Sequence, residues 1–315
     1  MSESTALPTH AASVSFADFG GPEQLRLGER AVPVPGPGQV LLRVHAAGVN
    51  PLDWKIRRGF MAEAFPVELP HVPGLEASGT VVALGPGVAN WQVGDEVFGP
   101  ALAAYARYTL AEAGTLAAKP ASLGWESAAA LPVAAETAYR ALELLAVKPG
   151  ETLLVHAAAG AVGSIAVQFA VANGVRVIGT ASAGNHAHLS ALGAVPVAYG
   201  EGLFGRVRAA APEGVDAVLD ASGSGVLAGS VELVGGPDRV VSVVNPAEAG
   251  PLGVRFTGGG GDEDRTVEGL AAALALHRAG TLDLQVRSAL PLAEAAAAQE
   301  LSEHGHGRGK IVLLP

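Results

Sequence analysis

The stretch ETLLVHAAAGAVGSIAVQFA, residues 151–170, decides the interpretation of the chain. Its first part, ETLLVHAA, is a short apolar run typical of a buried strand, and an amphipathic helix pattern follows it. Gly160 and Gly163 stand at the turn between them, where a residue without a side chain lets the backbone approach a pyrophosphate. Free N–H groups at the helix start would hold the negative charge. The stretch predicts a dinucleotide-binding unit.

The glycine spacing departs from the GxGxxG pattern because Ala158 stands where the first glycine is expected. On spacing alone, a plain strand–turn–helix unit without a ligand remains the alternative. The strand that follows, VRVIGTAS (175–182), favours the dinucleotide interpretation, because a second parallel strand belongs at this place in such a domain.

The end of this second strand indicates which cofactor is bound. An NAD-specific site places an Asp or Glu there for the ribose 2′-OH, but residues 175–200 contain no acidic residue. Thr180, Ser182 and Asn185 can instead donate hydrogen bonds to a 2′-phosphate. NADPH is therefore favoured, while a helix-capping serine and a turn asparagine are the structural alternative.

The pattern of predicted strands and helices differs between the two parts of the chain. Apolar strands such as VDAVLDA (215–221) and DRVVSVV (238–244) alternate with helical stretches, which predicts a doubly wound parallel sheet, a Rossmann domain, over 129–284. Before it, short β runs with Gly and Pro breaks, such as QVLLRVHAAGV (39–49), predict a β-rich domain. The tail ends in a strand, GKIVLLP (309–315), so we expect 285–315 to join 1–128 in one discontinuous domain.

Composition excludes several classes of function. The net charge is −10 and no run of Lys and Arg occurs, so nucleic acid is not an expected partner. No apolar stretch approaches the roughly 20 residues that a membrane-spanning helix needs. The first ten residues, MSESTALPTH, lack the features of a signal peptide and the chain has no cysteine, so we expect a cytoplasmic protein.

Several segments together resemble a known family. They are AAGVNPLDWKIRRG (46–59), VPGLEASGTVVALGPGV (72–88), VGDEVFG (93–99), AAAGAVG (157–163), VIGTAS (177–182), VLDASG (218–223) and GRGKIVLLP (307–315). In this order they resemble the zinc-independent quinone oxidoreductases and enone reductases of the medium-chain dehydrogenase/reductase superfamily. The resemblance implies an α/β protein with a GroES-like catalytic domain beside the Rossmann domain. It also implies a homodimer that transfers hydride from NADPH to a small-molecule quinone or to the C=C bond of an α,β-unsaturated carbonyl compound.

The positions that hold catalytic zinc in zinc-dependent relatives resemble Asn50, Leu75 and Val133 here. With no cysteine in the chain, neither the catalytic nor the structural zinc site can form in its usual way. Two close histidine pairs, His186 with His188 and His304 with His306, lie in stretches that we expect to be exposed, so no metal is expected.

A zinc-free reductase needs another group to stabilise negative charge on the substrate oxygen, and fixed donors or cations can do so. The NPLDWK segment offers Asn50 as a donor and Lys55 as a cation, which could also supply a proton. A turn asparagine and a surface lysine are the structural alternatives, and Asp53 is expected to cap a helix. The substrate pocket is expected to be lined by aromatic residues, for which core packing is the competing explanation: Trp54, Phe60, Phe65 and Phe256.

The resemblance also implies further cofactor contacts at matching positions, although Gly184 stands where relatives often have Arg. Lys310 is one of them, with closure of the sheet as its alternative role. The full predicted set is Thr137, Ala159, Gly160, Ala161, Val162, Gly163, Thr180, Ser182, Asn185, Tyr199, Val243, Val244 and Lys310.

The sequence lacks the motifs of two other enzyme classes. No Tyr is followed by Lys four residues later, as a short-chain dehydrogenase requires, and no GxSxG pentapeptide occurs for a serine hydrolase. Two alternatives stay open: a non-catalytic NADPH-binding protein, and a tailoring enoyl reductase of a biosynthetic pathway.

Overall fold

The structure is a computed structural model that describes residues 7–305 and 307–315, and it divides into two compact units. In the described chain, unit 1 comprises residues 7–132, 286–305 and 310–315, and unit 2 comprises residues 133–285 and 307–309. The predicted fold class is confirmed: unit 1 is β-rich and discontinuous in sequence, and unit 2 is built on a parallel sheet.

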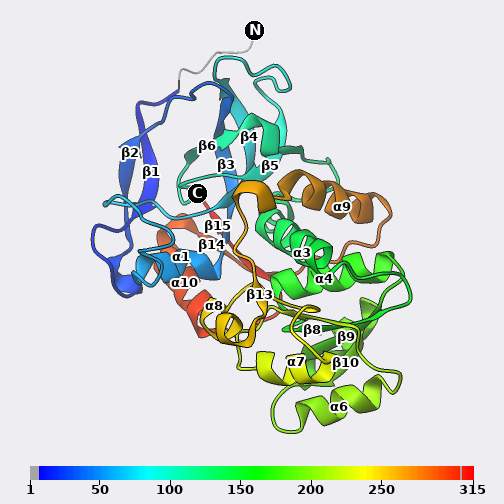
Figure 1. Ribbon diagram of the computed structural model, residues 1–315. Coiled ribbons are helices and arrows are strands. Elements are labelled where there is room, and N and C mark those ends of the chain that lie inside the picture. Colours follow the sequence, from blue (N-terminus) through cyan, green and yellow to red (C-terminus); the bar gives the residue numbers. More distant parts are fainter. Residues whose placement is uncertain (1–6, 306) are drawn as a thin grey trace. The chain divides into compact units, whose positions relative to one another are not determined.

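Unit 1 contains a seven-stranded sheet in the order β14-β15-β3-β4-β5-β7, with β6 paired to β3, and a separate β1–β2 pair (Figure 1). All pairs except β14–β15 are antiparallel. The strands are β1 (His10–Ser15), β2 (Arg26–Ala31), β3 (Gln39–Val49), β4 (Glu76–Leu84), β5 (Glu96–Pro100), β6 (Tyr108–Glu112), β7 (Ala117–Ala118), β14 (Val286–Pro291) and β15 (Lys310–Leu314).

The centre of unit 1 is β3, which pairs with β4, β6 and β15 and carries an apolar run whose residues fill the core. Helix α10 packs against α1, so the tail of the chain covers the segment that follows β3. The helices are α1 (Pro51–Arg57), α2 (Trp125–Ala129) and α10 (Ala295–His304), with short 3₁₀ turns at η1 (Pro22–Gln24), η2 (Ala113–Thr115) and η6 (Leu292–Glu294).

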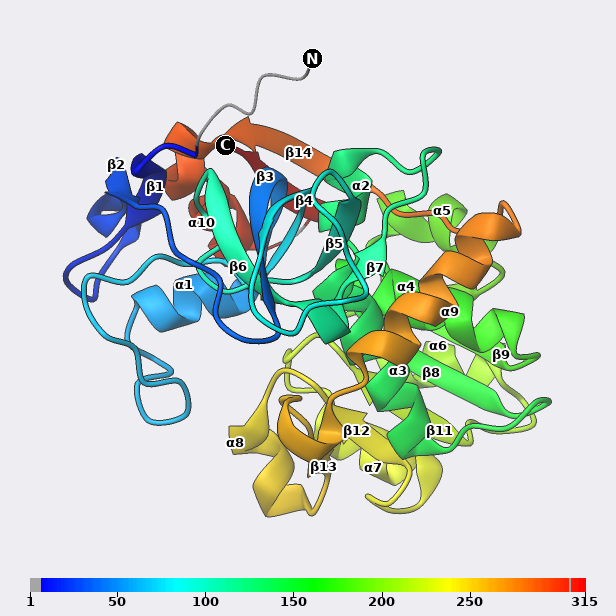
Figure 2. The ribbon, with the colours of Figure 1, turned by 90° about the horizontal axis from the view of Figure 1, so that it is seen from above.

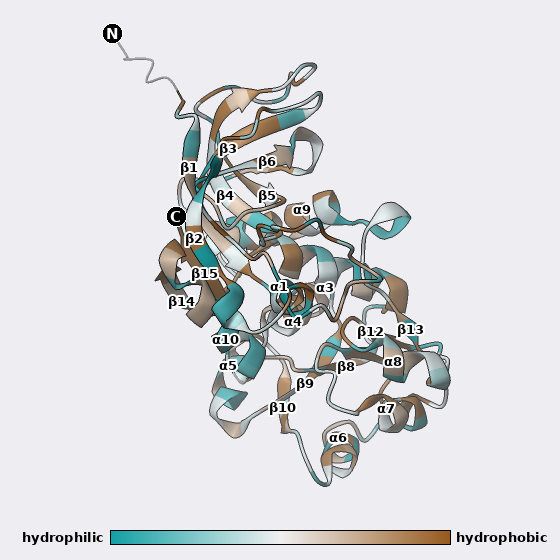
Figure 3. Cartoon of the chain, turned by 90° about the vertical axis from the view of Figure 1, so that its left-hand side faces the viewer, coloured by the Kyte–Doolittle hydropathy of each residue, from teal (hydrophilic) through white to brown (hydrophobic). Residues whose placement is uncertain are grey.

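Unit 2 contains six parallel strands in the order β10-β9-β8-β11-β12-β13. Counted along the chain this order is 3-2-1-4-5-6, the arrangement of dinucleotide-binding sheets, and its direction reverses between β8 and β11. Every residue of β8 is buried, as expected for a strand covered on both faces, and its hydrophobic residues appear brown in Figure 3. The strands are β8 (Thr152–His156), β9 (Arg176–Ala181), β10 (Val195–Ala198), β11 (Ala217–Asp220), β12 (Val240–Ser242) and β13 (Arg255–Phe256).

Helices cover both faces of this sheet (Figure 2). Residues of α6, α7 and α8 form one apolar cluster with Leu154, Ile178 and Val218 of the strands, whereas α4 contacts α9 on the other face. The helices are α3 (Pro132–Leu145), α4 (Ala161–Ala172), α5 (His186–Ala191), α6 (Leu203–Ala210), α7 (Leu227–Val234), α8 (Pro246–Ala249) and α9 (Thr266–Arg278), with 3₁₀ turns η3 (Ala183–Asn185), η4 (Gly250–Leu252) and η5 (Gly261–Glu263). No helix in the described chain is both long and apolar enough to span a bilayer.

Candidate functional site

The turn between β8 and α4 is held by the neighbouring strand β9. The Ala157 backbone N–H donates to the Thr180 hydroxyl at 3.2 Å, and the Ala158 N–H donates to the Thr180 carbonyl at 3.0 Å. Ala157 itself has a left-handed backbone, with φ of 55°, which lets the chain leave the strand sharply. Thr180 is only 2% exposed, so the structure places it inside the turn rather than at its surface.

Gly163 permits α4 to start directly on this turn. A Cβ at this position would lie 2.3 Å from the Ala157 carbonyl oxygen and 2.8 Å from the Ala158 Cα, and both are backbone atoms. At Gly160 a Cβ would approach the same oxygen only to 3.3 Å. Gly163 therefore fulfils the close-packing role of the last glycine in a dinucleotide-binding turn.

The first turn of α4 can bind an anion. Gly160 precedes the helix with an extended backbone, and the first N–H to bond back into the helix is that of Ser164, to the Gly160 carbonyl. The N–H groups before it, together with the helix dipole, are the usual holder of a pyrophosphate. Within this turn the Gly160 N–H donates to the Ala157 carbonyl at 2.9 Å. The turn contains five of the predicted cofactor residues: Ala159, Gly160, Ala161, Val162 and Gly163.

The register of the sheet brings most other predicted cofactor residues to the same edge. His156 pairs with Asp220, which pairs with Ser242, so the carboxyl ends of β8, β11 and β12 are level. Immediately beyond the strand ends, in partly or fully exposed positions, stand Ser182, Asn185, Tyr199, Val243 and Val244. Asn185 donates from its side chain to the Ser182 hydroxyl at 3.1 Å. Thr137 lies on α3, where its hydroxyl donates to Glu136.

Two features of this edge were not foreseen from the sequence. Asp220 is fully buried, and its carboxylate accepts from the Ser222 N–H and from the Ser242 hydroxyl, which fastens the loop after β11 to β12. Gly309 donates its N–H to the Ala159 carbonyl at 3.4 Å and pairs with Gly160. The VLDASG segment resembles the family, but its aspartate carries no local signal of this role.

In unit 1 the helix α1 begins at the buried end of β3. The Asn50 backbone N–H donates to the Asp53 carboxylate at 2.8 Å, so Asp53 caps this helix as expected. The Tyr105 hydroxyl donates to the same carboxylate at 3.0 Å. Burial raises the pKa of Asp53 from 3.8 to about 6, against the opposing effect of these hydrogen bonds and of Lys310.

The Asn50 side chain is engaged by two other buried groups. Its amide nitrogen donates to the Glu76 carboxylate at 2.8 Å, and its amide oxygen accepts from the Lys310 ammonium. Lys310 also forms an ion pair with Glu76 at 2.6 Å, with side chains 4% and 0% exposed. The structure therefore places Lys310, predicted as a cofactor contact, in a buried polar cluster of unit 1.

Lys55 lies on α1 beside Trp54, with its ammonium 5.8 Å from the indole ring centre. In the described chain no ion pair with a carboxylate involves this ammonium, and burial lowers the pKa of Lys55. Trp54 packs edge-on against Phe60 at 6.3 Å between ring centres, whereas Phe60 is 70% exposed and Phe65 is 39% exposed. Trp54 and Phe60 are thus brought together, whereas Phe256 lies on β13 of unit 2.

The histidine pairs differ from expectation. His188 is buried in α5, with its ring near the Asp283 carboxylate at 3.6 Å, so the prediction of an exposed pair with His186 is wrong for this residue. A local pattern could not show that this face of α5 is covered. His304 is exposed, and His306 lies outside the described residues. Among the residues that the structure describes, no group of three or more His, Cys, Asp or Glu side chains could hold a metal ion.

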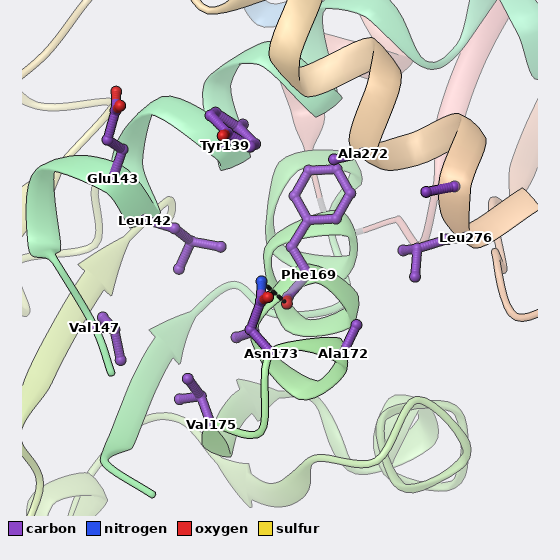
Figure 4. A pocket seen from close by; sticks show the side chains of 12 residues that line it. Tyr139, Leu142, Glu143, Val147, Phe169, Ala172, Asn173, Val175, Ala272 and Leu276 are labelled. Atoms are coloured by element: carbon purple, nitrogen blue, oxygen red, sulfur yellow. Dashed lines mark hydrogen bonds between the residues drawn. The ribbon is translucent and has the colours of Figure 1, made fainter. Parts of the chain in front are cut away.

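Unit 2 also has a cavity of about 380 Å³ between α3, α4 and α9 (Figure 4). Its walls include Tyr139, Phe169, Val175 and Leu276, and none of the predicted site residues lines it. Val175 stands just before β9, so the cavity lies toward the amino ends of the strands, opposite the edge with the α4 turn. It is separate from the predicted dinucleotide-binding turn.

Comparisons with known proteins agree with this geometry. Residues 36–139 match the family "Alcohol dehydrogenase GroES-like domain", and residues 192–313 match "Zinc-binding dehydrogenase". The chain is 32% identical to the quinone oxidoreductase of Homo sapiens, over 96% of this chain and 97% of that protein. It is 36% identical to 2-methylene-furan-3-one reductase of Solanum lycopersicum, over 81% of this chain and 67% of that protein. A mycobacterial protein solved in complex with NADPH superposes with a TM-score of 0.83 at 32% identity, covering 96% of this chain and all of that one.

Proposed function

We propose, from the premise that this chain belongs to the quinone oxidoreductase family of the medium-chain dehydrogenase/reductase superfamily, that it is an NADPH-dependent reductase of quinones or α,β-unsaturated carbonyl compounds. Members of this family are pyridine-nucleotide-dependent oxidoreductases that act on small molecules. The observation that carries the proposal is the β8–α4 turn, where Gly163 lets the helix start against the backbone of residues 157–158. A helix that starts this close to the preceding turn is the usual holder of a pyrophosphate, which supports the proposal.

The choice of NADPH rests on the edge beyond β9. Ser182 and Asn185 provide a hydroxyl and an amide there, and no carboxylate stands among residues 175–200 to repel a 2′-phosphate. Gly184 leaves open space around it. We assign Ser182, Asn185 and Tyr199 to the adenosine end, and Thr137, Val243 and Val244 to the nicotinamide end.

For the reaction, the bound nicotinamide would supply a hydride to the electrophilic carbon of the substrate. Charge then develops on the substrate oxygen, and the Lys55 ammonium is the group that can stabilise it or protonate it. Two properties suit Lys55: no carboxylate competes for its charge in the described chain, and burial lowers its pKa so that proton donation is easier. Asn50 was predicted as a second donor, but its amide is engaged with Glu76 and Lys310, so we give Lys55 the chemical role. Trp54, Phe60 and Phe65 of unit 1 are proposed to contact the substrate, and the assignment of Phe256 of unit 2 to the pocket stays a prediction from the sequence.

The reductase is proposed to act without zinc. Asn50, Leu75 and Val133 stand at the positions that correspond to the metal ligands of zinc-dependent relatives, and the chain has no cysteine. The proposal is testable by metal analysis of the purified protein, because an active enzyme with stoichiometric zinc would contradict it. We expect protein purified without added metal to contain no stoichiometric zinc and to remain active in the presence of a chelator.

The decisive experiment is steady-state oxidation of NADPH and, separately, NADH with 1,4-benzoquinone and with simple enones. We expect turnover with a preference for NADPH. The tomato relative is described as a reductase of a methylene-furanone, an enone, which favours including such compounds. Binding of NADPH without turnover across a broad panel would instead support the non-catalytic alternative, and a narrow preference for one enoyl substrate would support the tailoring reductase.

Oligomeric state is a separate part of the proposal. The family resemblance favours a homodimer, and light scattering coupled to gel filtration would report the molar mass directly. A monomer at micromolar concentration would remove the homodimer without affecting the proposed chemistry.

A further inference from the structure

Three polar groups that are far apart in the sequence meet in the core of unit 1. Asn50 follows β3, Glu76 begins β4 and Lys310 begins β15. Glu76 accepts hydrogen bonds from both partners' side chains, and Lys310 bonds the Asn50 amide oxygen as well, so the three side chains form a closed triangle. All three are at least 95% buried, with exposed fractions of 4% for Asn50, 0% for Glu76 and 4% for Lys310.

The surrounding backbone is shaped to accommodate this triangle. A Cβ at Gly48 would lie 2.2 Å from a Glu76 carboxylate oxygen, so only glycine on β3 allows the carboxylate to lie there. A buried ion pair adds little net stability, because the loss of hydration opposes the attraction. Its main physical consequence is directional: two charges and one amide fix each other's positions through bonds of defined geometry.

The triangle is joined to the first turn of α1. Asn50 contributes its side chain to the triangle and its backbone N–H to Asp53, which in turn accepts from Tyr105. Helix α1 therefore starts from a residue that is held on both sides. Two positions after Asp53 stands Lys55, whose ammonium makes no ion pair of its own in the described chain. Its position is set by the helix that carries it.

We propose that Lys310 and Glu76 are positioning residues for the reduction: their ion pair fixes Asn50 and the start of α1, and thereby holds the Lys55 ammonium in place. This assignment rests on the proposed function. It differs from the expectation that Lys310 contacts the cofactor, because the Lys310 ammonium bonds Asn50 and Glu76 within unit 1. A misplacement of a catalytic group by about 1 Å costs about a hundredfold in rate, so the effect is expected in kcat.

The test compares Lys310→Met, the double variant Glu76→Gln/Lys310→Met, and the matched control Lys119→Met. Lys119 is also an ion-paired lysine of unit 1: its ammonium lies 3.0 Å from the Glu96 carboxylate and 4.4 Å from the Trp125 ring centre, and its side chain is 5% exposed. The double variant removes both charges of the ion pair, so it avoids the buried, unpaired Glu76 charge of the single variant and is expected to fold even if the single variant does not. For each protein we would measure the melting temperature, the Kd for NADPH by fluorescence, and kcat and KM with 1,4-benzoquinone.

We expect kcat to fall about 10- to 100-fold in both Lys310 variants, with the Kd for NADPH within about twofold of the wild type. Lys119→Met should lower the melting temperature but keep kcat. Wild-type kcat in the folded Lys310 variants would overturn the proposal, and so would a weakened NADPH Kd with normal kcat, which would make Lys310 a cofactor contact. Failure of both variants to fold would assign the triangle to stability alone. Absence of turnover in the wild type would overturn the proposed function and this inference together, whereas the other results overturn only the inference.

Discussion

Replacement of Gly163 by alanine tests the physical basis of the dinucleotide site. The new methyl group would lie 2.3 Å from the Ala157 oxygen and 2.8 Å from the Ala158 Cα. Carbon and oxygen atoms in ordinary contact are about 3.3 Å apart or more, so α4 or the turn must move by about 1 Å. Neither atom belongs to a flexible side chain, and overpacking of this kind costs about 1–3 kcal/mol.

The displacement also redirects the N–H groups that begin α4. We therefore expect the Gly163→Ala protein to melt about 2–4 °C lower for each kcal/mol of lost stability. We expect the Kd for NADPH to rise about tenfold or more, which corresponds to about 1.4 kcal/mol of binding free energy. Differential scanning fluorimetry and a fluorescence titration with NADPH measure the two quantities.

Two other glycines of the same region serve as controls. Gly184→Ala places its methyl in open space and should change neither quantity appreciably. At Gly160 the methyl would meet the Ala157 oxygen at 3.3 Å, so Gly160→Ala should fold nearly normally, and any loss of NADPH binding there reports a close approach of the ligand. If Gly163→Ala melted and bound NADPH as the wild type does, the argument that this glycine shapes the site would be refuted.

Three further predictions concern other parts of the chain. Lys55→Met should lower kcat about tenfold or more, because it removes the group that stabilises or protonates the substrate oxygen. The control Lys148→Met changes an exposed lysine and should keep kcat. An unchanged kcat in Lys55→Met would remove Lys55 from the mechanism. Ser182→Asp should reduce the ratio of kcat/KM for NADPH over NADH through repulsion of the 2′-phosphate, and an unaltered ratio would contradict the placement of Ser182. Burial raises the pKa of Asp53 from 3.8 to about 6, so the folded protein binds the proton more tightly and this group's contribution to stability falls as pH rises from about 4 to about 6. The measurement is the free energy of unfolding of the wild type minus that of Asp53→Asn, obtained from urea titrations at several pH values. We expect this difference to fall by up to about 3 kcal/mol between about pH 4 and about pH 6. If the difference stayed constant over this interval, Asp53 would not have the raised pKa.

The parallel sheet could be predicted because its information is local. In ETLLVHAAAGAVG the strand, the turn and the helix start are consecutive, and each obeys a rule that needs no distant partner. The edge residues Ser182, Tyr199 and Val243 could also be placed, because the carboxyl ends of parallel strands meet at one edge once the strands are recognised.

The buried triangle could not be predicted, because it depends on pairing at long sequence separation. Lys310 and Asn50 are 260 residues apart, and they meet only because β15 pairs with β3. In sequence, the lysine of GRGKIVLLP has the same local signal whether it faces a ligand, solvent or the core. The same limit applies to His188, whose polar, turn-rich neighbourhood indicated exposure although α5 turns it inward.

The departure from the glycine pattern at Ala158 has its explanation on the neighbouring strand. Ala158 is fully buried, so its methyl group needs space that a glycine there would not require. That space exists because β9 has Gly179 beside it: a Cβ at Gly179 would lie 2.8 Å from the Ala158 Cβ. In the usual pattern the first position of the turn is the glycine. Here that position is Ala158, and the glycine is Gly179 on the adjacent strand, so the turn keeps its shape. A search for the glycine pattern in residues 158–163 alone therefore misses part of the evidence for such a turn. The requirement is that one of the two facing positions, 158 or 179, has no side chain, and either strand can provide the glycine.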